Sequence, residues 1–249
     1  MEGRVLDLIN IYIVGPAGSG KSTLVQSLGG WMESKGYRVS RVNLDPGAEL
    51  ICYPVDFDIR EYVTVTELMR REQLGPNGAL IRAAEMVEAR LEEISKAIGS
   101  RGGDFRILDT PGQMEIFLFR SFGPSLVSRI SGRSACIFTI DPSLASTWLD
   151  VPVIKLLALV IELRLGIPAL EAMTKSDMHR SVPSWLALEG VPSAQVGGLS
   201  GELASSLASV VGELEKKRRI IPVSSKTGKG IEDLYKAIGE LFCSCGDLT

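Results

Sequence analysis

The stretch Gly15-Pro16-Ala17-Gly18-Ser19-Gly20-Lys21-Ser22 matches the pattern G-x-x-x-x-G-K-[ST]. It follows an apolar run at residues 8–14 and opens a helix-like segment, so strand, loop and helix occur in the order that a phosphate-binding loop requires. In such a loop, glycines let backbone N–H groups point at an oxyanion, and the following helix adds its positive end. The stretch predicts a nucleoside triphosphate site, against the alternative of a chance glycine-rich turn.

The end of this stretch is expected to contact the nucleotide directly. Lys21 would reach the β- and γ-phosphates, where its charge makes it a catalytic candidate, and the Ser22 hydroxyl would ligate Mg²⁺. The predicted phosphate-binding residues are Gly18, Ser19, Gly20, Lys21, Ser22 and Thr23.

Apolar runs alternate with amphipathic segments along the rest of the chain. A helix is expected at residues 22–35, and a single long helix at 77–99, where apolar residues recur in steps of three and four. Further strands are expected at residues 37–43, 105–109, 135–141, 168–174 and 219–223. The pattern predicts an α/β fold: a three-layer P-loop NTPase with a mostly parallel sheet flanked by helices.

Bulk composition fits one such domain over residues 1–249. The 249 residues are 45% hydrophobic and 23% charged, enough for one large core. A formal net charge of −3 argues against a dedicated nucleic-acid surface, so no direct nucleic-acid partner is expected. No secretory peptide is evident after Met1, and a cytoplasmic location is expected.

A second constellation is Asp109-Thr110-Pro111-Gly112-Gln113, at the end of a predicted buried strand. Such an aspartate lies beside the phosphate loop, so Asp109 is a second candidate contact to Mg²⁺. The Gly112 N–H could donate to a γ-phosphate, and Gln113 could orient a water for attack. The alternative is a turn that only leads into a helix.

The choice of base is expected near the ends of the later strands. Thr174-Lys175-Ser176-Asp177 resembles the Asn-Lys-x-Asp guanine-reading motif, with Thr174 in place of asparagine. Asp177 would accept hydrogen bonds from guanine N1 and N2, and Lys175 would lie over the base or ribose. Ser225 and Lys226 resemble part of the Ser-Ala-Lys guanine loop. Together these segments favour GTP, although either alone could be a helix-capping loop.

The tripeptide Gly75-Pro76-Asn77 specifies the family. With the motifs above in the same order, the chain resembles the GPN-loop GTPases essentially from end to end, and its last residues, Cys243 to Thr249, resemble archaeal members. The resemblance includes residues 42–47 and 57–61. An isolated Gly-Pro-Asn would be only a turn before a helix, with Asn77 as its cap.

The resemblance implies a homodimer in which residues 75–77 of one subunit enter the active site of the other. Asn77 would then stabilise the departing phosphate in trans, as a neutral donor aimed at developing charge. Asp45 resembles an aspartate placed near Mg²⁺ and the attacking water, although residues 45–47 could also form only a turn. GTP would be the substrate and GDP the product.

The apolar segment 153–163 is shorter than the ~20 residues that span a bilayer, so no membrane partner is expected. Relatives carry a helical insertion at about 144–166. The segment is either buried in the fold or dimer interface, or part of a hydrophobic client groove. The resemblance implies a role in assembling complexes such as RNA polymerase. Residues 181–201 are expected to form a mobile loop, followed by an apolar helix stripe at 203–214.

Two alternative functions stay open. Cys243 and Cys245 could bind metal, which would make the chain a metal-delivery GTPase, although an incidental pair is the simpler interpretation. A small-molecule kinase shares the phosphate loop, but Asp177 and Gln113 do not encourage that interpretation.

Overall fold

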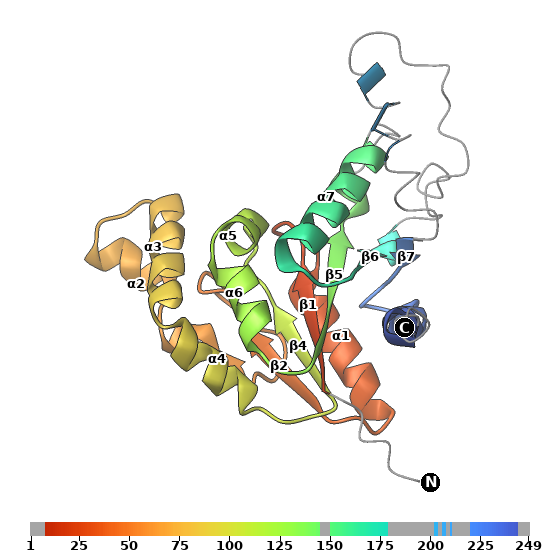
Figure 1. The fold of residues 1–249 in the computed structure, drawn as a ribbon, viewed down its shortest axis with the longest axis horizontal. Helices are drawn as coiled ribbons and strands as arrows, with labels where there is room; N and C mark the ends of the chain where they lie inside the picture. The colour runs from red at the N-terminus through yellow and green to blue at the C-terminus, as the bar shows by residue number, and fades with distance from the viewer. Residues whose placement is uncertain are drawn as a thin grey trace.

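The computed structural model describes residues 8–144, 150–178, 202–203, 206–207, 210 and 220–243. Its strands are β1 (Ile9–Val14), β2 (Val39–Asn43), β3 (Phe57–Asp58), β4 (Phe105–Asp109), β5 (Arg133–Ile140), β6 (Ala169–Met173) and β7 (Ile220–Pro222). Among these residues they form one sheet in the order β3-β2-β4-β1-β5-β6-β7, with every neighbouring pair parallel (Figure 1). The predicted parallel α/β sheet is confirmed.

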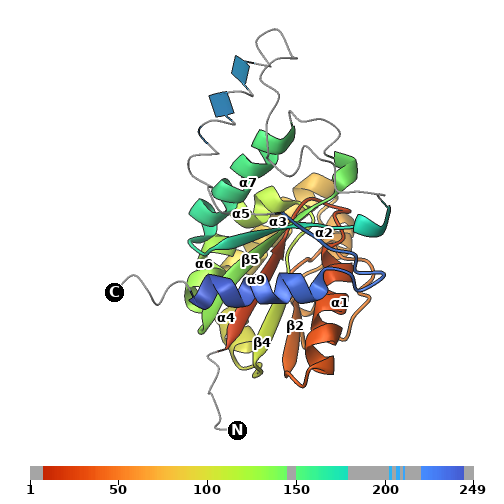
Figure 2. The same ribbon diagram turned by 90° about the vertical axis from the view of Figure 1, so that its right-hand side faces the viewer.

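Helices cover both faces of this sheet. α1 (Lys21–Ser34) and α9 (Ile231–Cys243) lie on one face, in front of the strands in Figure 2. The opposite face carries α3 (Pro76–Ala89), α4 (Leu91–Gly99), α5 (Met114–Phe119), α6 (Phe122–Arg129) and α7 (Asp150–Leu165), and α2 (Val65–Arg71) packs beside α3. In β1, Ile11 and Ile13 face α1 whereas Tyr12 and Val14 face the other layer, because strand side chains alternate. The three predicted layers are present.

The single helix expected at residues 77–99 is wrong. The structure has two helices, α3 and α4, separated at Arg90, whose φ of −111° and ψ of 17° leave the helical region. The Arg90 guanidinium lies over the Tyr62 ring at 4.6 Å. The apolar stripe continues across this break, since Val87, Leu91 and Ile94 are all buried, so periodicity could not reveal it.

Helix α7 covers most of the range predicted as a helical insertion, and it joins the neighbouring strands β5 and β6. One side of α7 is core: Ile154, Ala158, Ile161 and Leu165 are buried. The other side leaves Val153 50% and Leu163 83% exposed. One side of the segment therefore belongs to the core, as the first interpretation expected. The other side is exposed apolar surface, which is compatible with an interface or a client groove.

Several sequence predictions fall outside the described residues. The predicted mobile loop at 181–201 is one, and Cys245 is another. Of the predicted stripe at 203–214, Leu203, Leu207 and Val210 are described. Leu203 and Val210 are more than half exposed, whereas Leu207 is half-buried. Among the helices of the described part, none is long and apolar enough to cross a membrane.

Candidate functional site

Parallel strands bring the predicted motifs to one edge of the sheet, because the carboxyl ends of all seven strands point the same way. β1 leads into the phosphate loop and β4 ends at Asp109. β2 leads to Asp45, and β6 leads to Lys175 and Asp177. The strand order places the phosphate loop near the middle of this edge.

The phosphate loop has the backbone expected for anion binding. Gly18 and Gly20 have φ angles of 77° and 87°, the left-handed region that glycine enters without strain, and α1 begins directly afterwards at Lys21. Lys21 donates hydrogen bonds to the carbonyls of Gly15 at 3.0 Å and Pro16 at 3.1 Å. Burial lowers the pKa of Lys21, although nearby Asp109 and Asp45 oppose this shift. The ammonium thus lies within the loop, where a phosphate would meet it.

Two side chains, Thr139 of β5 and Thr174 after β6, brace this loop through Ser19. The Ser19 and Thr139 hydroxyls share a hydrogen bond of 2.7 Å, and Thr174 Oγ1 donates to the Ser19 carbonyl at 2.7 Å. Ser19 and Thr174 are buried, and both hydroxyls make hydrogen bonds that hold the loop in place. Thr174 therefore links the loop to the predicted base-reading segment through its hydroxyl. Thr139 belongs to none of the sequence motifs, so the sequence analysis did not identify it.

The predicted base-reading residues line one pocket of about 200 Å³. Its lining comprises Gly20, Thr23, Thr174, Lys175, Asp177, Met178, Ser225 and Lys226. Ser224 Oγ donates to Asp177 Oδ1 at 2.7 Å, which orients that carboxylate and lowers its pKa. Lys175 has a positive φ of 54°, and its ammonium pairs with Asp141 at 2.6 Å. Seven of the residues predicted to bind the nucleotide therefore line one pocket.

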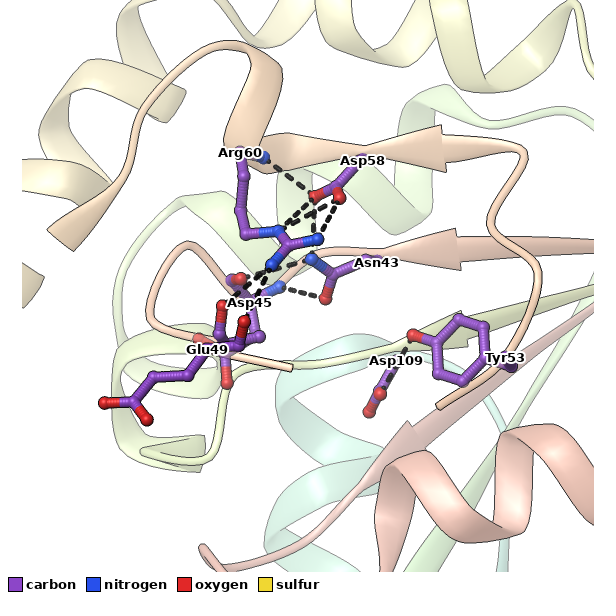
Figure 3. Close-up of polar contacts among 8 residues, drawn as sticks. Asn43, Asp45, Glu49, Tyr53, Asp58, Arg60 and Asp109 are labelled. Carbon is purple, nitrogen blue, oxygen red and sulfur yellow. Dashed lines mark hydrogen bonds and ion pairs between the residues drawn. The ribbon is translucent and has the colours of Figure 1, made fainter. Parts of the chain in front are cut away.

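Asp109 provides the most specific sign of a cation site. Tyr53 donates to Asp109 Oδ2 at 3.0 Å (Figure 3), whereas the buried Oδ1 has no hydrogen-bond partner within the described chain. Burial raises the pKa of Asp109 to about 6, although the Ser22 hydroxyl, Tyr53 and the charge of Lys21 lower it. A buried carboxylate oxygen without a protein donor, beside the Ser22 hydroxyl, suits a hard divalent cation such as Mg²⁺.

Asp45 and Gly112 meet each other in the structure. Asp45 Oδ2 accepts a hydrogen bond from the Gly112 N–H at 3.1 Å, and its Oδ1 accepts one from the Gly47 N–H at 2.8 Å. The N–H predicted to sense a γ-phosphate is thus donated to the carboxylate predicted to support metal or water. The two groups to which these roles were assigned are therefore joined by one hydrogen bond.

A polar network holds the Asp45 loop against β3 (Figure 3). Asn43 donates to Asp58 Oδ1 at 2.8 Å and accepts from the Asp45 N–H at 3.1 Å. Arg60 pairs with Asp58 at 2.6 Å and donates to the Ala48 carbonyl at 3.0 Å. Although burial opposes it, hydrogen bonds from Arg60 and Asn43 lower the pKa of Asp58. Asn43 and Arg60 were quoted within the family segments, but the sequence analysis gave them no role.

Asn77 and Gln113 also lie together within one chain. Pro76 begins α3 with Gly75 before it, so Asn77 stands in the first turn and does not cap the helix. Gln113 Nε2 donates to Asn77 Oδ1 at 3.5 Å in a bond that solvent reaches; Asn77 is exposed and Gln113 is half-buried. The tripeptide therefore lies at the edge of its own chain's candidate site, with Asn77 exposed.

Ionised Asp109 should destabilise the protein when no cation is bound. Because its folded pKa is raised, the folded state binds a proton more readily than the unfolded chain, and stability falls as pH rises from about 4 to above 6. In EDTA at pH 8, Asp109→Asn should therefore melt roughly 5 °C higher than the unmodified protein. The difference in melting temperature between the two proteins should narrow towards pH 5, and thermal unfolding measured from pH 5 to pH 8 would detect this change. A difference of the same size at every pH would contradict a raised pKa of Asp109.

Comparisons with known proteins agree with this geometry. The family model described as "conserved hypothetical ATP binding protein" matches residues 13–244. The chain is 35% identical to GPN-loop GTPase PAB0955 of Pyrococcus abyssi, over 96% of this chain and 99% of that protein. It is 30% identical to GPN-loop GTPase 3 of Aspergillus fumigatus, over 93% of this chain and 80% of the relative. It is 28% identical to GPN-loop GTPase 1 of Dictyostelium discoideum, and the match spans 61% of that longer protein.

The fold matches a solved relative as well. The crystal structure of PAB0955, a GTPase in apo form from Pyrococcus abyssi, has a TM-score of 0.85 and 31% identity, covering 95% of this chain and 98% of that one. The family model's description mentions ATP, whereas these relatives are named as GTPases. On the combined sequence, fold and site, this chain belongs to the GPN-loop GTPase family.

Proposed function

We propose that this GTPase is a Mg²⁺-dependent, homodimeric molecular switch that assists the assembly or remodelling of a protein complex such as RNA polymerase. The observation that carries the switch is the hydrogen bond from the Gly112 N–H to Asp45. A γ-phosphate and Asp45 would compete for this one donor. GTP would therefore release Asp45, and hydrolysis would return it to Gly112.

Different side chains of the site have different roles in the proposed hydrolysis. Lys21 neutralises charge on the β- and γ-phosphate oxygens, and Gln113 orients the attacking water. The Asn77 amide donates to charge that develops on the transferring phosphoryl group. Ser22 and Asp109, supported by Asp45, would hold Mg²⁺, which supplies charge neutralisation between the phosphates when bound.

The Asp45 loop connects this chemistry to the tripeptide at residues 75–77. The Val65 N–H, at the start of α2, donates to the Pro46 carbonyl at 3.0 Å, so α2 is tied to the same loop. α2 packs against α3, which begins at Pro76. Release of Asp45 would therefore shift the helix pair that presents the tripeptide to the second subunit.

An apolar pocket beside the phosphate loop supports a nucleotide-sensitive client site. Its walls combine α7 with residues of the site: Pro16, Met114, Phe138, Thr139, Ile140, Asp141, Asp150, Val153, Ile154 and Leu157. Pro16 belongs to the phosphate loop, and Met114 follows Gln113 directly. Movement of these two residues with the nucleotide would change the shape of the pocket.

No observation in the described part of the chain favours metal delivery as the function. Residues 8–144, 150–178 and 220–243, with the short pieces between, contain no group of three or more His, Cys, Asp or Glu side chains placed to hold a metal ion. Cys245 lies outside them. The assembly switch is therefore the function that we propose.

Client binding should depend on the nucleotide. Protein loaded with a non-hydrolysable GTP analogue should retain subunits of a multiprotein complex from native extract that GDP-loaded protein does not retain, as quantified by mass spectrometry. Val153→Asp, in the apolar pocket, should abolish this capture. Val55→Asp, at a similarly exposed valine near β3 and the other edge of the sheet, should not. Identical captures in both nucleotide states would contradict the assembly switch.

Action of Asn77 in trans predicts complementation between two inactive variants. Asn77→Ala lacks the amide, and Lys21→Ala lacks phosphate binding, so each alone should hydrolyse GTP at least tenfold more slowly. A mixed dimer would place an intact Asn77 against an intact phosphate loop. In an equal mixture about half of the dimers should be mixed, each with one complete site, so fast single-turnover hydrolysis should return at up to about a quarter of the sites. Lack of recovery, with mixed dimers confirmed by mass spectrometry, would show that Asn77 acts within its own chain.

Asp177 should determine the choice of base. Asp177→Asn places an amide where guanine requires an acceptor, so GTP affinity should fall on the order of 100-fold. Xanthosine triphosphate, which has a carbonyl in place of the guanine amino group, should gain affinity. Titration with fluorescent nucleotides would measure the affinities for both nucleotides. Asp233→Asn, at an exposed position of α9, is the control. Equal loss for both nucleotides would argue against base reading by Asp177.

A further inference from the structure

The two carboxylate oxygens of Asp109 have different surroundings. Oδ2 accepts a hydrogen bond from the Tyr53 hydroxyl at 3.0 Å, and Oδ1 has no such donor in the described structure. Asp109 is only 3% exposed, so water has little access to either oxygen. A freely rotating carboxylate would present both oxygens equally, but this one is held in a single orientation.

Tyr53 reaches Asp109 because the segment after the Asp45 loop folds back over the start of α1. Cys52 Sγ lies 3.6 Å from the Ser22 carbonyl, which places this segment against the phosphate-binding end of the helix. The Tyr53 ring packs in the core between α1 and the sheet, among residues that include Leu24 and Ile107, and is 6% exposed. Packing therefore fixes the ring, and the ring fixes the hydroxyl (Figure 3).

The chemical type of the donor matters as much as its position. A lysine or arginine at position 53 would orient the carboxylate but would also neutralise the charge that attracts a divalent cation. A phenol donates one hydrogen bond and carries no charge. Asp109 thus keeps its full negative charge and directs it through one oxygen.

We propose that Tyr53 is a positioning residue for the cation site: its hydroxyl holds Asp109 Oδ2, so that Oδ1 faces a Mg²⁺ ion shared with Ser22. This inference rests on the proposed function, because it requires a cation at Asp109. Neighbours that orient a metal ligand typically contribute about 10–100-fold to metal affinity. Removing the Tyr53 hydroxyl should therefore weaken the cation more than the nucleotide.

The test uses Tyr53→Phe in the full chain. Mn²⁺ affinity of the GDP-bound protein, measured by electron paramagnetic resonance, should fall about tenfold. GDP affinity in EDTA should stay within about twofold of that of the unmodified protein, since phosphate and base contacts are intact. In hydrolysis, the Mg²⁺ concentration for half-maximal rate should rise about tenfold while the rate at saturating Mg²⁺ changes little.

Tyr37→Phe is the matched control. It also removes a tyrosine hydroxyl from a hydrogen bond, the one of 2.6 Å with Tyr235. Tyr37 follows the C-terminal end of α1 and packs on Phe105 at the start of β4, whereas Asp109 is at the end of β4. Its Mn²⁺ affinity should match that of the unmodified protein. Thermal unfolding of both variants reports any general loss of structure.

Three outcomes would overturn the inference. If Tyr53→Phe binds Mn²⁺ as the unmodified protein does, Tyr53 has no positioning role, and the proposed function stands. If Mn²⁺ affinity and GDP affinity in EDTA fall together, the role of Tyr53 is only structural. If the unmodified GDP complex binds no Mn²⁺, and Asp109→Ala changes nothing, the proposed cation site itself is wrong, and the inference falls with it.

Discussion

The hydrogen bond from the Thr174 hydroxyl to the Ser19 carbonyl is the contact on which the site depends. It joins the phosphate loop after β1 to the base-reading segment after β6, and the Ser19–Thr139 bond adds β5 between them. Close approach is obligatory here, since a Cβ at Gly15 would lie 2.1 Å from Thr139 Oγ1. The predicted phosphate-binding and base-reading segments therefore belong to one braced unit, which keeps their spacing constant.

The sequence predicted the fold best where burial was complete. β4 has the predicted bounds, Phe105–Asp109, because all five of its residues are buried and an aspartate ends the run. β3 was missed because two residues carry no periodicity, and only pairing with β2 defines them as a strand. The break at Arg90 was missed for the opposite reason, since the apolar stripe runs through it unchanged.

The same distinction applies to the site. Residues within glycine-containing or charged motifs, such as Lys21, Asp109 and Asp177, could be predicted because the motif itself requires their chemistry. Tyr53 and Thr139 could not, since each acquires its role only when the chain folds onto a distant partner. The Tyr53–Asp109 bond joins residues 56 positions apart, and the Ser19–Thr139 bond joins residues 120 apart. Single-sequence reasoning finds the groups proposed to contact the ligand more readily than those proposed to position them.

Electrostatics explains why such positioning matters at this edge of the sheet. Asp109 and Asp45 place two carboxylates around Lys21, and their mutual repulsion adds to the effect of burial on Asp109. The Lys21 donors are directed at the loop carbonyls, so the lysine only partly offsets this charge. Under the proposed function, a cation bound beside these carboxylates would offset their repulsion. Part of the stability given up here would then return as binding energy for the cation and the nucleotide.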